Sequence, residues 1–584
     1  MNLNRVRLGV VFAVSLGLVL SPTTLLAEDD DDLGLELVPL TRPDDEEPVA
    51  EEPEEDAPEP EAIEEPAPHT PPAPEEEVAP ATPRKDRTWT PAPEVHSIYD
   101  EYQARVRFNA EPGIRSPAEQ VARVSLFGVD VDVRPMHEWW HVGAGGFGAA
   151  LGNLGGFFGG GLQGGVRLEL VEPIAFEAGA MLGAGGGSGA PIGSGFFVRP
   201  RAGVYVDLQG AGGYIEGGSI TLSQLRFPNG DFASTHLAVS FEMGAATLMY
   251  PGLGDRTSPR LRDEGYGANT RSFRFTSHGY FPLAGRSLTL ADDALSDSRM
   301  LIGLEYREFL APRVFGLIEP RANVAGGEAG FAELTVGAGV SVPVDERVSV
   351  FASGGVGGAG GGGVRTGGGM YVRAALGLDV DLPGPFSVGV DAGFQDAPRG
   401  GSFTALSTGL RLGLTQEVVR PMAYSVRPLT QGDEVMAATW RLRPSHQSLF
   451  DVPEGTDSVA AHLLGLKADY FVNEHLFLSA GAAFAYAGLD ATALSTGTVA
   501  LGGIGPDWSG VRLTGEARLG AAGGGGIGAG SGLLIQPMAG ANVEITEALS
   551  FDILGGFALA PTGEMRSPAV DVGLTYAFST PRLR

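Results

Sequence analysis

The fold is decided by the stretch Phe351–Leu382, which reads FASGGVGGAGGGGVRTGGGMYVRAALGLDVDL. From Met370 onward, apolar residues alternate with polar or small residues at a period of two, the period of a β-strand with one apolar face. The glycines before Met370 are typical of hairpin loops and of strand ends where bulk is excluded. The stretch therefore predicts a strand preceded by a Gly-rich loop.

Two further stretches, Glu177–Leu208 and Thr514–Ile545, align with this one over 32 residues without a gap. They start 174 residues before it and 163 residues after it. Several glycine columns are shared by all three copies, among them Gly195, Gly369 and Gly532. Propeller and solenoid repeats are about 20–50 residues long, so this longer period indicates duplication of a block of several strands.

The same alternation recurs between Val121 and Phe578 with few helical stretches, which predicts an all-β protein. A β-sandwich usually closes after about 7–9 strands, and its exterior would carry many lysines, whereas this chain has only Lys85 and Lys467. We therefore expect one large antiparallel transmembrane β-barrel of about 16–22 strands, covering residues 121–584 and grown by duplication. The alternative is a set of tandem small eight-stranded barrels, because the repeat offsets are close to the size of such a barrel.

The last strand of the pattern is Val570–Phe578, in which Leu574, Tyr576 and Phe578 share the apolar face. This strand resembles the closing strand of Gram-negative outer-membrane β-barrels, the porin-like superfamily. The resemblance implies an outer-membrane location, contact with membrane lipid and lipopolysaccharide, and recognition of the closing-strand aromatic by the barrel assembly machinery. In that family the aromatic is normally the last residue, whereas here Ser579–Arg584 follow it.

The N-terminal part of the chain has a different composition. Residues 1–27 carry two arginines, then a short apolar run, and end at Ala27, which is the pattern of a cleaved signal peptide. Residues 28–93 hold 23 acidic residues, 4 basic residues and 15 prolines, which predicts a disordered acidic leader. Its Pro-Glu alternation is similar in composition to TonB-type spacers, which implies a periplasmic location and leaves room for a periplasmic partner. Residues 94–120 are expected to connect the leader to the barrel.

Composition excludes several kinds of chemistry. The 584 residues include no cysteine, so disulfides, Cys-ligated zinc and thiol catalysis are excluded. The formal net charge of −31 argues against nucleic-acid binding, which needs a basic surface.

One string, His137-Glu138-Trp139-Trp140-His141, matches the H-E-x-x-H motif of zinc proteases. That motif works on a helix, but the flanking residues here alternate as a strand does. On a strand, histidines four residues apart are separated by ~13 Å, too far to share one metal ion. We interpret Trp139 and Trp140 as an aromatic girdle at the lipid headgroup level. We expect no catalytic residue, no metal, no cofactor and no enzymatic activity.

Two functions are compatible with these patterns. The first is a porin-like or export channel, in which charged side chains on the polar strand face line the lumen and tune selectivity. The residues expected in that lumen are Arg199, Arg201, Asp207, Arg373, Asp381 and Glu544. The second is a non-conducting barrel with a structural, tethering or surface-adhesion role.

Overall fold

The computed structural model describes residues 100–115, 123–135, 139–208, 214–252, 265–295, 297–327, 329–398, 401–430, 432–454, 456–489, 494–524 and 526–584. The expected signal peptide and acidic leader lie outside the described residues. Within them the chain forms 25 β-strands and a short 3-10 turn, η2, at Met422–Tyr424. The described residues include no helix of the length and apolarity needed to cross a membrane.

The first eight strands close into a ring, because β1 pairs with both β2 and β8. We refer to this ring as the first barrel. Its strands are β1 (Asp100–Arg115), β2 (Arg123–Pro135), β3 (Trp140–Gly152), β4 (Phe158–Val171), β5 (Ile174–Gly186), β6 (Phe196–Asp207), β7 (Ile215–Arg226) and β8 (Ala233–Pro251). The structure therefore places a strand, β1, within the stretch 94–120 that we expected to be a connection.

The next eight strands form the second barrel, which closes where β16 pairs with β9. Its strands are β9 (Tyr266–Pro282), β10 (Arg299–Ala311), β11 (Val314–Ala325), β12 (Ala332–Pro343), β13 (Val348–Gly360), β14 (Met370–Asp381), β15 (Phe386–Asp396) and β16 (Thr404–Pro421). A two-residue strand, β17 (Arg427–Pro428), adds to β9 in the segment that follows.

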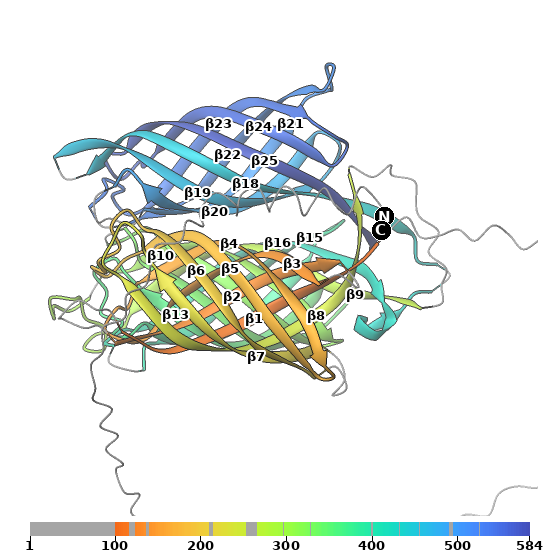
Figure 1. Ribbon diagram of the computed structural model, residues 1–584, viewed down its shortest axis with the longest axis horizontal. Coiled ribbons are helices and arrows are strands. Elements are labelled where there is room, and N and C mark those ends of the chain that lie inside the picture. Colours follow the sequence, from red (N-terminus) through yellow and green to blue (C-terminus); the bar gives the residue numbers. More distant parts are fainter. Residues whose placement is uncertain are drawn as a thin grey trace, which may run out of the picture. The chain divides into compact units, whose positions relative to one another are not determined.

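The third barrel closes where β25 pairs with β18. Its strands are β18 (Val435–Glu454), β19 (Asp457–Phe471), β20 (Leu476–Ala487), β21 (Ser495–Ile504), β22 (Val511–Gly523), β23 (Leu533–Glu544), β24 (Leu549–Leu559) and β25 (Arg566–Leu583). Figure 1 shows these strands, in blue, closing on one another.

The all-β antiparallel class predicted from the sequence is confirmed. The 25 strands form one connected hydrogen-bonded system, since short pairings join β25 to β8 and to β16. Their closure, however, follows the alternative of tandem eight-stranded barrels, and the expectation of one ring of 16–22 strands is corrected. The physical reason is that the eighth strand of each block pairs along its length with the first strand of the same block, so neither keeps an open edge for the next block.

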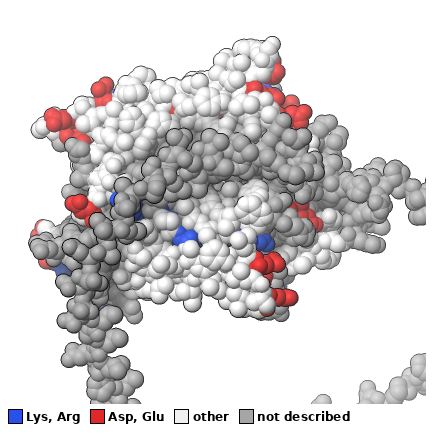
Figure 2. Space-filling model, in the orientation of Figure 1, with Lys and Arg blue, Asp and Glu red and all other residues white. Residues whose placement is uncertain are grey.

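The alternation seen in the sequence separates the lumen from the outer wall. On β14, Tyr371 and Arg373 point inward and are buried, whereas Leu376 is 65% exposed on the outer wall. On the part of the visible face that the structure describes, Figure 2 shows mostly uncharged residues with a few Lys and Arg near the middle, and Asp and Glu gathered toward the two ends. The outer wall of the barrels is therefore apolar between two charged ends.

Each barrel has a loop end and a turn end. The turn end carries short connections such as the one between Val171 and Ile174, and the loop end carries the Gly-rich connections of the three repeats. The repeats themselves are β5–β6, β13–β14 and β22–β23. They occupy the same position in each barrel, so the duplicated block is a complete eight-stranded barrel.

The three barrels contact one another through equivalent strands. The third strand of one barrel lies against the fifth and sixth strands of the next: β3 meets β13 and β14, β11 meets β22 and β23, and β20 meets β5 and β6. Such head-to-tail contacts between different surfaces close into a ring when the rotation allows it. Here they close after three barrels, so one chain forms an intramolecular trimer.

At the turn end, first and last strands of the barrels share a small apolar cluster. Its buried members are Leu248, Ala268, Val419, Val435 and Leu583, which come from all three barrels. β25 therefore does not stop at Phe578, the expected closing aromatic, but continues to Leu583, and the residues after Phe578 still pair with β18.

Candidate functional site: the barrel lumens

The lumen of the first barrel is crossed by a network of buried ion pairs. Arg107 contacts Glu177 (2.7 Å) and Glu242 (Nε to Oε1, 2.7 Å). Arg167 contacts the same two carboxylates, each at 2.7 Å. All four side chains are at most 7% exposed, so two guanidinium groups and two carboxylates neutralise one another inside the barrel.

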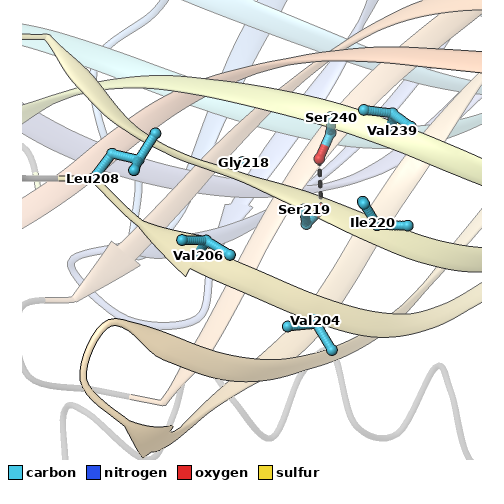
Figure 3. A pocket seen from close by; sticks show the side chains of 8 residues that line it. All are labelled: Val204, Val206, Leu208, Gly218, Ser219, Ile220, Val239 and Ser240. Carbon is cyan, nitrogen blue, oxygen red and sulfur yellow. Dashed lines mark hydrogen bonds between the residues drawn. The ribbon is translucent and has the colours of Figure 1, made fainter.

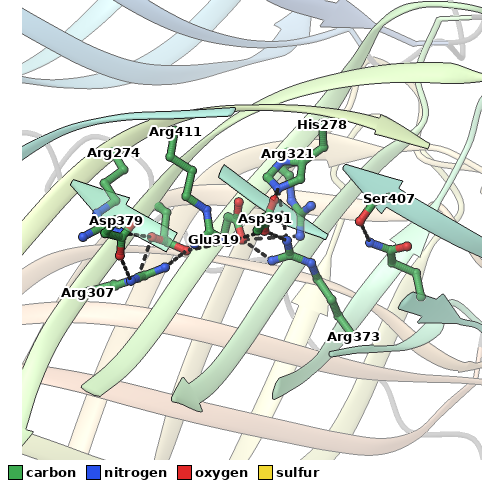
Figure 4. A network of polar contacts seen from close by, with 12 residues as sticks. Arg274, His278, Arg307, Glu319, Arg321, Arg373, Asp379, Asp391, Ser407 and Arg411 are labelled. Carbon is green, nitrogen blue, oxygen red and sulfur yellow. Dashed lines mark hydrogen bonds and ion pairs between the residues drawn. The ribbon is translucent and has the colours of Figure 1, made fainter. Parts of the chain in front are cut away.

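The second barrel repeats this arrangement with other residues (Figure 4). Asp379 accepts hydrogen bonds from Arg274 at 2.7 Å and from Arg307 at 3.0 Å. Arg373 donates to Glu319 at 2.7 Å and to Asp391 at 2.9 Å. These residues come from β9, β10, β11, β14 and β15, so the network ties opposite walls of the barrel together.

The lumen of the third barrel carries a network of the same kind. Arg443 contacts Glu516 at 2.6 Å and Asp469 at 2.9 Å. Asp571 contacts Arg518 at 2.8 Å and also Lys467.

Toward the loop end, each lumen is filled by an apolar cluster. In the first barrel, loop phenylalanines Phe157, Phe227 and Phe232 are buried, with ring centroids 5.6–6.0 Å apart. Phe331 and Phe403 occupy the corresponding cluster of the second barrel, and Ile527 and Met565 that of the third. An eight-stranded barrel is just wide enough for its interior to be filled by side chains, and these three are filled by ion pairs and loop residues.

The residues predicted to face a lumen fall into two groups. Arg199, Arg201 and Arg373 do point into a lumen, and each is neutralised there: Arg199 by Glu111, Arg201 by Asp130 (3.0 Å), and Arg373 as described above. The other three lie at strand ends, where Asp381 and Glu544 are exposed and Asp207 is partly exposed.

Several carboxylates of the lumen networks were not predicted from the sequence. Four of them are single acidic residues among mainly small or apolar residues of a strand: Glu177, Glu242, Glu319 and Glu516. An acidic residue on the inward side of the alternation is the sequence signal that could have identified them. Which arginine each one meets depends on strand pairing, since Arg105 and Glu242, for example, lie 137 residues apart in the chain.

The remaining predicted residues lie at strand ends or on the outer wall. Trp139 is 56% exposed directly before β3, and Trp140 is the first residue of that strand. Tyr576 and Phe578 stack on β25 with ring centroids 6.1 Å apart, and Leu574 precedes them on the same side. His137 and Glu138 lie outside the described residues. His141 is buried in β3, which continues as a strand and not as the helix that a zinc-protease motif needs.

The outer wall of the first barrel carries a shallow groove of about 310 Å³ (Figure 3). It is lined mainly by Val204, Val206, Leu208, Ile220 and Val239, and small residues of β7 and β8 form the rest. Such a lining is suited to contact with an acyl chain and offers no ionisable group for chemistry.

No protein-family model and no curated protein matches the chain. Among solved structures, 82% of the chain is similar to the siderophore receptor PirA of Pseudomonas aeruginosa, with 10% identity, 80% of that chain covered and a TM-score of 0.25. The FrpB iron transporter of Neisseria meningitidis matches with 8% identity, 81% of that chain covered and a TM-score of 0.25. OccAB3 of Acinetobacter baumannii matches with 9% identity, 99% of that chain covered and a TM-score of 0.22. At such low identities and TM-scores, nothing about function is transferred from these proteins to this chain.

Proposed function

We propose that this protein is an outer-membrane β-barrel protein with a non-conducting, structural role, in which three closed barrels anchor the N-terminal leader. The observation that carries the proposal is the filling of all three lumens by neutralised ion pairs and loop side chains. This favours the structural and tethering role over the porin-like or export channel.

A membrane location is supported by the outer wall. Side chains such as Leu222 and Leu513, 57% and 55% exposed, face outward on strands whose inward residues are charged or polar. An apolar band of this kind, bounded by aromatic residues, is what a lipid bilayer requires of a barrel. Membrane lipid and lipopolysaccharide are then the contacts of this wall, and the barrel assembly machinery would insert it.

The tethering role is assigned to the N-terminal leader. Residues 28–93 are too acidic and proline-rich to form a core of their own. The leader precedes β1 in the sequence; in the periplasm it would present a charged segment to a periplasmic partner.

Planar-bilayer recording of the folded, full-length protein tests the non-conducting role. We expect no reproducible single-channel steps, because permeating ions would have to displace buried ion pairs. Folding is verified first by heat-modifiable migration on gels. Regular conductance steps from protein that passes this check would overturn the proposal and restore the channel.

Deletion of residues 28–93 tests the tether separately. The shortened protein is expected to insert in the outer membrane and to keep its heat-modifiable mobility, while losing any periplasmic protein that co-purifies with the full chain. A failure of the shortened protein to insert would contradict the assignment of the leader as a tether only.

A further inference from the structure

The outer wall of the third barrel holds a cluster of four polar side chains that no lumen network uses. His446 and Ser448 come from β18, His462 from β19 and Tyr486 from β20. In the sequence these residues are scattered, but the strand register places Ser448 directly opposite His462. The four residues face outward, because Arg443 and Gln447 of β18 occupy the inward side. We refer to them as the outer-wall cluster.

The distances within the outer-wall cluster are those of hydrogen bonds. The Ser448 hydroxyl oxygen is 3.0 Å from His446 Nε2 and 3.0 Å from His462 Nδ1. The opposite nitrogen of His446, Nδ1, is 3.3 Å from the Tyr486 hydroxyl. The two imidazole rings stack with centroids 5.6 Å apart. A serine, a histidine and a third group that orients the histidine are therefore arranged in a chain.

This arrangement has the geometry of an activated nucleophile. A serine hydroxyl is a weak nucleophile unless an adjacent base accepts its proton, and the base is held in place by a group on its other nitrogen. Here His446 can take the proton through Nε2, while Tyr486 fixes its orientation through Nδ1. His462, as its Nδ1–H tautomer, can donate a hydrogen bond to oxygen at the same point.

The surroundings of the cluster are apolar, and Ser448 itself is 8% exposed among them. Phe450 and Leu464 are 41% and 36% exposed on the same wall, and Val570, which pairs with Ser448, is also exposed. Phe196 of the first barrel packs against Tyr486 with ring centroids 6.4 Å apart. The cluster therefore lies where the outer wall of the third barrel meets the first barrel, since β19 and β20 contact β4, β5 and β6. Ionisable groups in an apolar membrane environment are costly and generally mark a functional site.

The position of the cluster along the barrel axis determines which part of a lipid molecule it would contact. Tyr470, which packs against Trp440 at the turn end, lies eight residues along β19 from His462, or ~27 Å along the strand. With strands tilted by about 35–45°, that separation corresponds to ~19–22 Å along the barrel axis, most of the ~25 Å height of the apolar band of a membrane barrel. The cluster thus lies well toward the loop end from this pair, which is itself packed against Leu414 of the second barrel, and on the side of the wall where the ester groups of one leaflet would lie.

We propose that the outer-wall cluster is a hydrolytic site for fatty-acyl esters of membrane lipids, with Ser448 as nucleophile, His446 as general base and Tyr486 as a positioning residue. This activity rests on the membrane location proposed above. The Ser448 oxygen bonds to the acyl carbonyl carbon while its proton passes to His446. The bond from the carbonyl carbon to the alcohol oxygen then breaks, and the alcohol leaves with that proton. Water, activated by His446, hydrolyses the acyl-serine and releases the fatty acid.

In this scheme His462 stabilises the negative charge that develops on the carbonyl oxygen. The carbonyl oxygen gains charge as the tetrahedral intermediate forms, and a positioned N–H donor lowers the free energy of that state. Within the cluster, the available donor is the Nδ1–H of His462, which lies 3.0 Å from the Ser448 oxygen.

Two assays on the full-length folded protein test the site. The first is covalent labelling by a fluorophosphonate probe in detergent micelles, and the second is release of fatty acid from a p-nitrophenyl fatty-acyl ester in the same micelles. Ser448→Ala should abolish labelling and lower hydrolysis at least 100-fold. Ser445→Ala, on the same strand but on its inward side, is the matched control and should leave both unchanged.

Further variants separate catalysis from structure. His446→Gln should lower hydrolysis about as much as Ser448→Ala, and Tyr486→Phe should lower kcat roughly tenfold at unchanged KM, because only the orientation of the base is lost. Absence of labelling and hydrolysis in protein with heat-modifiable mobility would overturn the hydrolytic site, as would activity that persists in Ser448→Ala. Because micelles replace the bilayer, this outcome is independent of whether the protein lies in the outer membrane.

Discussion

At the scale of single residues, the buried carboxylates should dominate stability. Glu177 neutralises both Arg107 and Arg167 in the lumen of the first barrel. Glu177→Gln removes that charge and leaves two buried guanidinium groups with one carboxylate fewer, so we expect a loss of about 3–5 kcal/mol in the free energy of unfolding. Urea unfolding of the protein in lipid vesicles, followed by tryptophan fluorescence, measures this.

The control is an ion pair outside the lumens. Arg512 and Glu544 contact each other at 3.1 Å with side chains 24% and 35% exposed. Arg512→Gln should change the free energy of unfolding by about 0–1 kcal/mol, because solvent already screens the pair. Equal effects of the two substitutions would show that the lumen of the first barrel is hydrated and not packed.

The sequence indicates the side of a strand on which a residue lies, but not the partner that it meets. Strand alternation puts Arg199, Arg201 and Arg373 on the same side of their strands as the buried residues, because the period of two depends only on local backbone geometry. It could not place Asp381 or Glu544, since alternation does not say where a strand ends. Nor could it find the outer-wall cluster, because Ser448 and His462 become neighbours only through the pairing of β18 with β19.

At the scale of elements, the shared glycines explain how the barrels fit together. Gly195, Gly369 and Gly532 all have positive φ, and a Cβ on each would meet a backbone carbonyl of the neighbouring barrel, belonging to Ala485, Ala149 and Asn323 respectively. The glycine column that the repeats share is therefore required by the contact between a Gly-rich loop and the end of a third strand. The sequence predicted the loop but not the neighbour against which it packs.

Gly369→Ala tests this role of the glycine. The added Cβ would lie 2.3 Å from the Ala149 carbonyl oxygen, and φ is +91°. The left-handed conformation alone costs a non-glycine residue about 1–2 kcal/mol, and the clash adds to that cost by separating the first and second barrels. Gly384→Ala is the matched control, since its φ is +81° but nothing lies within 4 Å of the added Cβ. Unfolding free energies that fall equally for both variants would refute a packing role for Gly369.

At the scale of the whole molecule, the sequence left the closure of the strands open. One large ring and three small rings require the same alternation, the same turns and the same repeat. They differ only in which distant strand pairs with the free edge of the last strand in a block. The offsets of 174 and 163 residues were the one feature that favoured small rings, since they match a complete eight-stranded block. Duplication of a closed barrel, with a contact surface on each side, accounts for both the repeat and the cyclic arrangement.

Division of the chain between the second and third barrels tests this architecture. A break between Thr430 and Gly432 falls after β17 and before β18, so it interrupts no barrel ladder. We expect the two fragments, co-expressed with a signal peptide on each, to fold separately and to assemble, because the contacts of β20 with β5 and of β11 with β22 form without a covalent link. Co-purification through a tag on the C-terminal fragment, with heat-modifiable mobility of both fragments, measures the assembly. In a single large ring the break would leave two open sheets. Two fragments that each stay folded when expressed alone would therefore be incompatible with one ring. Loss of folding in both fragments would be incompatible with three separate barrels.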